Sequence, residues 1–336
     1  MSNTIKDIAK ALNISPSTVS RALSDNKNIS DETKKKVKKM AKKLNYQKNT
    51  WASALRTKET KMLGVIVPSL KNPFFAHAIS GMQQVANQVG LRVVICQSNE
   101  DPETEKAQLY TLQASGAEGI AVSITQNTKS LEHFKEVEEQ GVPVLFFDRG
   151  VDGSGFHQVE ANDFESGKIA TEHLINKGCK NIVHLAGPKH LKNSRKRLEG
   201  YQAALDEHGI PFKEELVIET GYETQNFSDE WIDHILQEKL KVDGIFAVSD
   251  PIAITAMVKL QKKGIKVPQD IKIIGFGRDD VGEWVNPNLS TVTQMPEKMG
   301  RETVNLFLEI KKTGLQNSKA HEIFTEAKLI ERDSSR

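Results

Sequence analysis

Polar and aromatic side chains follow many of the short apolar runs in this 336-residue sequence. They are amides, carboxylates, hydroxyls, guanidinium groups and phenyl rings, at Asn72, Phe74, Phe75, Asp148, Arg149, Arg195, Arg197, Ser249, Asp250 and Gln294. Carboxylate and guanidinium groups can each bind two hydroxyls, and an aromatic face covers the apolar side of a sugar ring. Together these residue types predict a site for a polar ligand with many hydroxyls. Any one charged group alone could equally be a structural ion pair or a helix cap.

Such a site needs strands whose ends meet along one edge, and the sequence supplies them. Short β-branched or aromatic runs alternate with amphipathic stretches of helix length: MLGVIVP, LRVVIC, GIAVSI, VPVLFFD, NIVHLAG, GIFAVSD and IKIIGF. This alternation predicts an α/β fold with parallel sheets covered by helices, and the number of runs suggests two lobes. Ligands of such sheets bind outside the carboxyl ends of the strands, where the polar residues above occur.

The charge is distributed unevenly along the chain. Residues 1–60 hold 14 Lys and Arg against 5 Asp and Glu, a net charge of +9, and the remainder holds 32 against 39, a net charge of −7. A compact basic module ahead of an acidic body predicts a polyanion as the partner of the first sixty residues. A lysine-rich run by itself is more often a solvated helix face, so the prediction depends on the motifs within the module.

Caps and apolar spacing predict three short helices in this basic module. Thr4 begins a capping box, and Asn13 can adopt the left-handed conformation of a tight turn after the first helix. Ser15 caps the second helix with Pro16 at its first position, and Ser30 caps the third. Two helices joined by a tight turn and completed by a third form a helix-turn-helix unit, which places the start of its second helix in the major groove. The alternative is a plain three-helix bundle.

The second predicted helix begins SPSTVSR, whose hydroxyls can approach phosphates and base edges and whose Arg21 can make two hydrogen bonds to guanine. The segment TIKDIAKALNISPSTVSRALSDNKNISDETKKKVKKMAKKLNY closely resembles the headpiece of the LacI/GalR family of bacterial transcription regulators. The resemblance implies a homodimer that binds a pseudo-palindromic operator in double-stranded DNA under the control of a small effector. It implies DNA contacts from residues of the headpiece, 1–48: Thr4, Ser15, Pro16, Ser17, Thr18, Ser20, Arg21, Asn28, Ser30 and Tyr46.

The connector NTWASALRTK contains neither Gly nor Pro and therefore differs from a flexible linker. By the same resemblance it is a hinge helix, within residues 49–60, that becomes ordered on operator DNA. Asn49 would cap this helix, Ala52 would let two hinge helices pack closely, and Leu55 would enter the minor groove and bend the duplex.

The remaining residues, 61–336, resemble the LacI/GalR core, which has the fold of periplasmic sugar-binding proteins. The motifs NPFFxxxxxG, VPVLFFDR, RxRxxGYxxAL, SDPxAxxAM and PxLSTVxQ occur in order. The resemblance implies an effector-binding and dimerisation core with one lobe at about 62–161 and 290–322, the other at about 162–289, and the effector between them. No leucine heptads follow KLIERD, which favours a dimer over a tetramer.

The sequence departs from this family at GFGRDD, where an effector-contacting Asp is usual. Gly277 takes that position, and Arg278 lies beside it. One hypothesis is therefore an anionic effector, such as a sugar acid or sugar phosphate, in place of a neutral sugar. The alternative is that Asp279 or Asp250 replaces the missing carboxylate.

Enzymatic motifs are absent from the sequence. It contains no GxSxG, HExxH or P-loop, and ESGKI lacks the first Gly and the Ser or Thr that a P-loop requires. Scattered histidines and two distant cysteines predict no metal site, no cofactor and a reducing compartment. With no apolar signal segment or membrane-length run, the sequence favours a cytoplasmic regulator. The rival interpretation is a sugar-binding protein without a regulatory role, which the basic first sixty residues argue against.

Overall fold

The computed structural model describes residues 4–46, 60–222, 224, 227–277, 280–315 and 320–336. The chain divides into two compact units, Met1–Thr60 and Lys61–Arg336, which we call the headpiece unit and the core. The predicted hinge residues Asn49, Ala52 and Leu55 lie outside the described residues, as does Arg278.

The headpiece unit contains the three predicted helices, α1 (Ile5–Leu12), α2 (Pro16–Leu23) and α3 (Asp31–Lys43). Thr4 and Asp7 form the capping box, while Ser15 and Ser30 accept backbone N–H groups at the starts of α2 and α3. Asn13 is left-handed, with a φ of 52°. Apolar side chains from all three helices form one small buried core, which includes Ile8, Ala9, Val19, Ala22, Val37 and Ala41.

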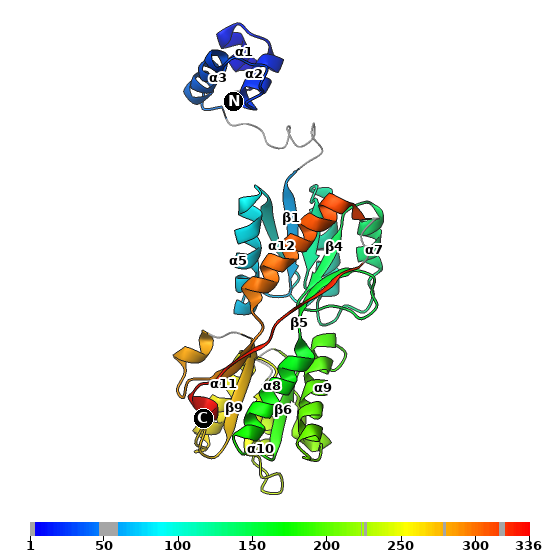
Figure 1. Ribbon diagram of the computed structural model, residues 1–336, viewed down its shortest axis with the longest axis vertical. Helices are drawn as coiled ribbons and strands as arrows, with labels where there is room; N and C mark the ends of the chain where they lie inside the picture. Colours follow the sequence, from blue (N-terminus) through cyan, green and yellow to red (C-terminus); the bar gives the residue numbers. More distant parts are fainter. Residues whose placement is uncertain (1–3, 47–59, 223, 225–226, 278–279, 316–319) are drawn as a thin grey trace. The chain divides into compact units, whose positions relative to one another are not determined.

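The first lobe of the core is a six-stranded sheet in the order β11-β5-β4-β3-β1-β2, and its strands pair in parallel. The strands are β1 (Met62–Val67), β2 (Arg92–Gln97), β3 (Gly119–Val122), β4 (Val144–Phe147), β5 (His157–Ala161) and β11 (Glu322–Thr325). The helices are α5 (Pro73–Gln88), α6 (Pro102–Ala114), α7 (Glu132–Glu139) and α12 (Pro296–Thr313). One apolar cluster packs α5 and α12 against the sheet, and a second packs α6 and α7. Helices therefore cover both faces of the sheet (Figure 1), while the edge strand β2 keeps exposed residues.

The second lobe repeats this plan in the order β12-β10-β9-β8-β6-β7. Its strands are β6 (Ile182–Ala186), β7 (Val217–Glu219), β8 (Gly244–Ala247), β9 (Lys272–Gly277), β10 (Ser290–Thr293) and β12 (Lys328–Ile330). Its helices are α8 (Asp163–Asn176), α9 (Lys192–Glu207), α10 (Asp229–Ile235) and α11 (Asp250–Lys262), with 3-10 turns η1 (Glu214–Leu216), η3 (Val281–Trp284) and η5 (Asp333–Ser335). All its strand pairs are parallel except β10 with β12.

The predicted return to the first lobe at residue 290 needs correction. Residues Ser290–Thr293 form β10, which pairs with β9 inside the second sheet. The chain therefore returns to the first lobe only with α12. After β11 it crosses a third time, because β12 pairs with β10. The reason is that β10 has a partner strand in the second lobe, a long-range pairing that a local apolar pattern does not identify. Three crossings therefore join the lobes: between β5 and α8, between β10 and α12, and between β11 and β12.

Two glycines let α8 and α9 approach closely. A methyl group at Gly167 would lie 2.2 Å from the carbonyl oxygen of Arg197, and one at Gly200 would lie 2.0 Å from that of Phe164. Both distances are far shorter than van der Waals contact, so any larger residue would push the helices apart. The close packing holds Arg197 of α9 against the first turn of α8.

Two further observations bear on the class of protein. Both cysteines are free thiols; Cys179 is buried and Cys96 is half-buried. Across the described residues, none of the helices has both the length and the apolar character needed to span a bilayer.

Candidate functional site

The start of α2 presents a cluster of hydroxyls on the headpiece. Ser15 Oγ lies 2.8 Å from both Ser17 Oγ and Thr18 Oγ1, and it accepts the Thr18 N–H over 3.1 Å. Ser15, Pro16 and Ser17 are exposed, while Thr18 and Ser20 are half-buried. The cap therefore fixes a rigid helix start whose hydroxyls and ring face solvent.

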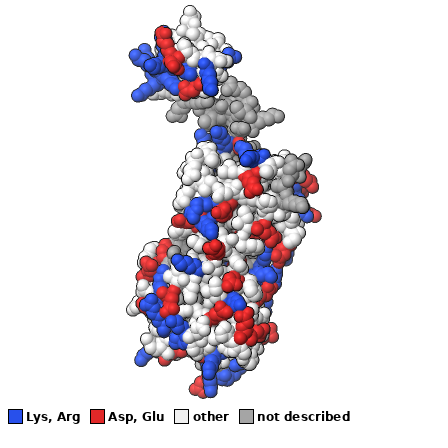
Figure 2. Space-filling model, viewed as in Figure 1, with Lys and Arg blue, Asp and Glu red and all other residues white. Residues whose placement is uncertain are grey.

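The other predicted DNA-contacting residues surround this helix start. Arg21 is exposed on α2, Thr4 and Ser30 are exposed at the starts of α1 and α3, and Asn28 is exposed in the loop before α3. Tyr46 differs, because its ring packs against the small apolar core. Figure 2 shows Lys and Arg side chains grouped on the headpiece, consistent with the lysine run of α3. The headpiece thus combines a polar helix start with a cationic surface.

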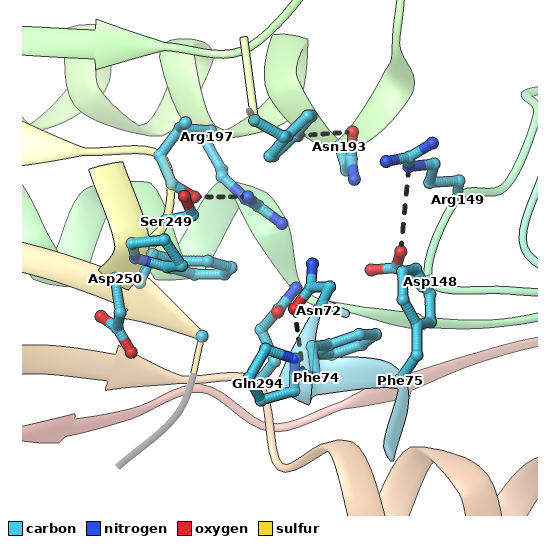
Figure 3. A pocket seen from close by; sticks show the side chains of 16 residues that line it. Asn72, Phe74, Phe75, Asp148, Arg149, Asn193, Arg197, Ser249, Asp250 and Gln294 are labelled. Atoms are coloured by element: carbon cyan, nitrogen blue, oxygen red, sulfur yellow. Dashed lines mark hydrogen bonds and ion pairs between the residues drawn. The ribbon is translucent and has the colours of Figure 1, made fainter. Parts of the chain in front are cut away.

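In the core, one cavity of about 630 Å³, its open mouth included, lies between the two lobes (Figure 3). Both lobes contribute to its wall, which consists of Asn72, Pro73, Phe74, Phe75, Asp148, Arg149, Asn193, Arg197, Tyr222, Val248, Ser249, Asp250, Pro251, Phe276, Gly277 and Gln294. Nine of the ten residues predicted from strand ends are among them. The tenth, Arg195, is not: its side chain is 42% exposed and pairs with Asp152 over 2.7 Å. Arg195 is therefore withdrawn from the predicted site.

Seven wall residues were not among the ten predicted ones, and three of these seven are polar or aromatic: Asn193, Tyr222 and Phe276. Phe276 ends the run IKIIGF, and Asn193 opens the polar stretch after NIVHLAG, so both carried the strand-end signal. Tyr222 follows β7, a strand of only three residues without a recognisable apolar pattern. Tyr222 has clear structural partners, because its hydroxyl lies 2.8 Å from Ser194 Oγ and donates to Asn193 Oδ1 over 3.2 Å.

The two arginines of the wall are both held by carboxylates behind it. Arg149 donates from Nη1 and Nη2 to Glu100 over 3.0 and 2.9 Å, and from Nη1 to the carbonyl of Ile124 over 3.1 Å. Arg197 donates from Nε to Asp163 over 2.8 Å and from Nη1 to the carbonyl of Val248 over 2.9 Å. These bonds leave further N–H groups on each guanidinium for a ligand in the cavity.

Two carboxylates also face the cavity. Asp148 adopts a left-handed backbone with a φ of 63° at the end of β4, and it accepts a hydrogen bond from Ser123 Oγ over 3.3 Å. Burial raises the pKa of Asp148, although the nearby Arg149 and Arg197 oppose that shift. Asp250 begins α11 and accepts from Thr291 Oγ1 over 2.7 Å. The wall therefore offers acceptors as well as donors.

Aromatic faces and an amide complete the wall. The Phe276 ring stacks on the Arg197 guanidinium, with 3.8 Å between Cζ of Arg197 and the ring centroid. The Tyr222 ring centroid lies 5.4 Å from Cζ of Arg149. Asn72 caps α5 by accepting the Phe74 N–H over 3.0 Å. Ser249 Oγ is buried and has no hydrogen-bond partner among the described residues. Donors, acceptors and flat apolar faces in one cavity suit a polyhydroxylated ring.

Gly277 widens the cavity at the end of β9. A methyl group there would be 3.8 Å from Asp250 Oδ2 and 3.9 Å from Gln294 Oε1, so this part of the wall has room beside two acceptor groups. Among the described residues, no group of three or more His, Cys, Asp or Glu side chains could hold a metal ion.

Comparison with known proteins gives a consistent result for both units. Residues 4–49 match the family of bacterial regulatory proteins of the lacI family, and residues 60–329 match the periplasmic binding proteins and sugar binding domain of the LacI family. The ribose operon repressor of Halalkalibacterium halodurans is 30% identical over 99% of this chain and 97% of its own length.

Solved structures match the chain as well, one of them over its whole length. The lac repressor dimer bound to operator and the anti-inducer ONPF has a TM-score of 0.88 at 23% identity, covering 100% of this chain and 99% of the other. A periplasmic binding protein/LacI transcriptional regulator from Alkaliphilus metalliredigens, complexed with D-xylulofuranose, has a TM-score of 0.71 at 26% identity, covering 82% of this chain and 99% of its own.

Proposed function

The chain belongs to the LacI family of bacterial regulatory proteins, and we propose that the cavity of its core binds a neutral carbohydrate-type effector that controls operator binding by the headpiece. Membership in this family makes the chain a DNA-binding transcriptional regulator and not an enzyme. The headpiece match also argues against the rival interpretation, a sugar-binding protein without a regulatory role.

The observation that carries the effector proposal is the composition of the cavity wall. Asp148 and Asp250 supply acceptors, Arg149 and Arg197 supply free N–H groups, and Phe276 supplies a flat apolar face. A ring with several hydroxyls can satisfy all three kinds of group at once, whereas an apolar molecule would leave N–H groups and carboxylate oxygens of the wall without hydrogen-bond partners. Two similar proteins support this class, because one relative is a ribose operon repressor and one similar structure holds D-xylulofuranose.

The anionic alternative rests on Arg278, which lies outside the described residues. Within the described wall, both arginines already have carboxylate partners, so the wall offers no unpaired cation for a sugar acid or phosphate. We therefore propose a neutral sugar, with Asn72, Phe74, Phe75, Asp148, Arg149, Arg197, Ser249, Asp250 and Gln294 as predicted contacts and Asn193 and Tyr222 added to them.

Effector control requires that the ligand favours one of two arrangements of the lobes, because equal affinity for both would change nothing. We propose that the regulator acts as a homodimer in the cytoplasm, and that residues 1–48 bind DNA while the hinge, 49–60, transmits the lobe arrangement. Two headpieces would read the two half-sites of a pseudo-palindromic operator.

A ligand panel tests the proposal on the full chain. Neutral sugars, sugar acids and sugar phosphates are screened by thermal shift, and each hit is then added to a DNA-binding assay. We expect a neutral sugar to raise the melting temperature and to change DNA affinity, with the sign of the change identifying an inducer or a corepressor. Stabilisation by sugar acids or sugar phosphates alone, or hits that leave DNA binding unchanged, would overturn the proposal.

A further inference from the structure

The two cations of the cavity wall share an arrangement that bears on ligand charge. Arg149 and Arg197 line the cavity, but their main partners, Glu100 and Asp163, lie behind them and outside the wall. With Asp148 and Asp250 in the wall, the described cluster contains four carboxyl groups and two guanidinium groups. Each cation is thus compensated before a ligand enters.

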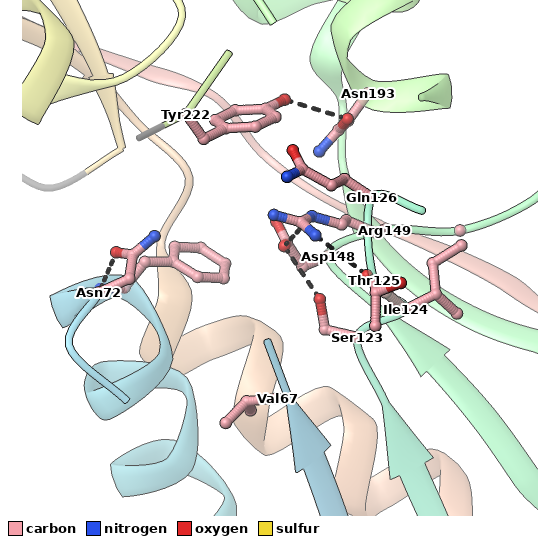
Figure 4. Close-up of polar contacts among 12 residues, drawn as sticks. Val67, Asn72, Ser123, Ile124, Thr125, Gln126, Asp148, Arg149, Asn193 and Tyr222 are labelled. Atoms are coloured by element: carbon pink, nitrogen blue, oxygen red, sulfur yellow. Dashed lines mark hydrogen bonds and ion pairs between the residues drawn. The ribbon is translucent and has the colours of Figure 1, made fainter. Parts of the chain in front are cut away.

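Glu100 is built to hold Arg149 in one orientation. Its two carboxylate oxygens accept separate hydrogens from Nη1 and Nη2, the two-bond geometry that fixes a guanidinium most firmly. Figure 4 shows the Arg149 guanidinium between Asp148 and the carbonyl of Ile124. That carbonyl accepts the second hydrogen bond donated by Nη1. The Arg149 side chain is 6% exposed and that of Glu100 is 16% exposed, so solvent screens the pair only weakly.

The backbone around Glu100 also has a defined geometry. Asn99 and Glu100 are both left-handed, with φ values of 56° and 57°. Glu100 Oε2 accepts the Gln126 N–H over 2.8 Å, and the Glu100 carbonyl accepts from Asn127 Nδ2 over 3.0 Å. This turn therefore positions the carboxylate in advance, with no contact to the cavity itself.

We propose that Glu100 is the residue that sets the charge selectivity of the effector cavity. By compensating Arg149 and fixing its orientation, it leaves N–H groups that bind hydroxyls and removes the net positive charge that would attract a carboxylate or a phosphate. An anionic ligand beside Arg149 would add a like charge next to Glu100 and Asp148 in a weakly screened site. The inference rests on the proposed function, since it names the determinant of ligand class at the same site. Glu100 is a positioning residue and not a ligand contact.

The test is the substitution Glu100→Gln, which keeps the shape and one acceptor oxygen but removes the charge. Binding of matched pairs, glucose with glucuronate and galactose with galacturonate, is measured by calorimetry on the wild type and the variant. We expect the ratio of uronate to neutral-sugar affinity to rise by about tenfold or more in Glu100→Gln. A merely structural role would lower both affinities together and leave the ratio unchanged, which would overturn the proposal.

Glu118→Gln is the matched control. The Glu118 side chain is 11% exposed, pairs with Lys311 and accepts the Lys61 N–H, but it precedes β3 at the end opposite the cavity. The ratio of uronate to neutral-sugar affinity in Glu118→Gln should equal that of the wild type. A rise of this ratio as large as in Glu100→Gln would refute a specific role for Glu100.

Two further measurements cover other outcomes. If Glu100→Gln does not fold, Glu100→Asp must still raise the ratio by a smaller factor, because its shorter carboxylate cannot reach both nitrogens; an unchanged ratio would contradict the proposal. If no sugar binds the wild type, the carbohydrate function fails separately. In that case the affinity for inorganic phosphate, measured at constant ionic strength, tests the role of Glu100 alone. Phosphate must bind Glu100→Gln at least about tenfold more tightly than the wild type, and equal binding refutes the role of Glu100.

Discussion

Arg197 donates its Nε hydrogen to Asp163 Oδ1 over 2.8 Å, and both side chains are at least 95% buried. The pair joins α9 to the first turn of α8, where Gly167 and Gly200 let the helices touch. The same guanidinium stacks on Phe276 and reaches the cavity wall. One ion pair therefore supports both the packing of the second lobe and the orientation of a predicted effector contact.

Asp163→Ala should lower the free energy of unfolding by about 3–5 kcal/mol, because it leaves a buried guanidinium without its carboxylate. Urea unfolding of the full chain measures the loss. Asp229→Ala serves as the control, since its carboxylate is 75% exposed and pairs with Lys259 at the surface, and we expect it to cost less than about 1 kcal/mol. Similar losses in the two variants would contradict this account of the buried pair.

Arg197→Gln and Arg195→Gln should differ strongly in effector affinity. Arg197 lines the cavity, and loss of hydrogen bonds from a buried charged donor typically weakens binding by about 10- to 100-fold. Arg195 pairs with Asp152 outside the wall, so its substitution should leave the affinity within about twofold of the wild type. Calorimetry with the sugar found by the panel makes the comparison, after both variants are shown to be folded by circular dichroism. Equal losses would place the ligand elsewhere.

Helix geometry explains why sequence reasoning included Arg195 wrongly. Residues two positions apart on a helix point to nearly opposite sides, so Arg195 and Arg197 of α9 cannot both face one cavity. In the sequence this stretch follows the apolar run NIVHLAG, but in the structure α9 already begins at Lys192. The other nine strand-end residues line the cavity because parallel strands bring their carboxyl ends to one edge of a sheet, and the order of strands and helices can be read from the sequence.

Local signals also predicted the headpiece, whose caps at Thr4, Ser15 and Ser30 depend on neighbours within three residues. Long-range pairing was less predictable. The lobe boundary at residue 290 was wrong because β10 pairs with β9, and Tyr222 was missed because β7 is very short. The network behind the wall, with Glu100 49 positions from Arg149, has no local signature at all.

His184 should make the core lose stability in acid. Its imidazole is fully buried and stacked on Phe246 at 4.5 Å, and burial together with the charge of Arg197 lowers its pKa from 6.5 to about 4. The unfolded chain therefore binds more protons than the folded chain between these values. The contribution of His184 to the free energy of unfolding is fully present above pH 6.5. It falls as the pH drops towards 4, by at most about 3 kcal/mol.

The substitution His184→Phe keeps a flat ring but cannot titrate, so its unfolding free energy should depend less on pH between 6.5 and 4. Chemical denaturation at a series of pH values measures the slope. His208→Gln, at an exposed histidine, should retain the wild-type slope. An unchanged slope in His184→Phe would show that other groups cause the acid sensitivity.

Arg21→Ala should reduce binding to the operator by about 10- to 100-fold, because a two-bond contact with guanine contributes about 1–3 kcal/mol of discrimination. Arg21 is exposed on α2, so the headpiece should fold normally. Lys39→Ala, an exposed lysine of α3, should instead weaken operator and random DNA to a similar extent. Titrations with both DNAs at several salt concentrations separate the two effects, and equal loss for both DNAs in Arg21→Ala would remove it from base recognition.

Deletion of residues 1–60 should abolish DNA binding and leave effector affinity unchanged. The division of the chain into Met1–Thr60 and Lys61–Arg336 supports this expectation, because the core retains both six-stranded sheets, their apolar clusters and every residue of the cavity wall. Leu55→Ala in the full chain tests the hinge alone. It removes the side chain predicted to enter the minor groove, so operator binding should fall while effector binding is retained. Fluorescence anisotropy with operator DNA and calorimetry with the effector measure the two properties separately. Residual operator binding by the deleted chain would show that the core itself contacts DNA, and a loss of effector affinity in Leu55→Ala would mean that the hinge also shapes the cavity.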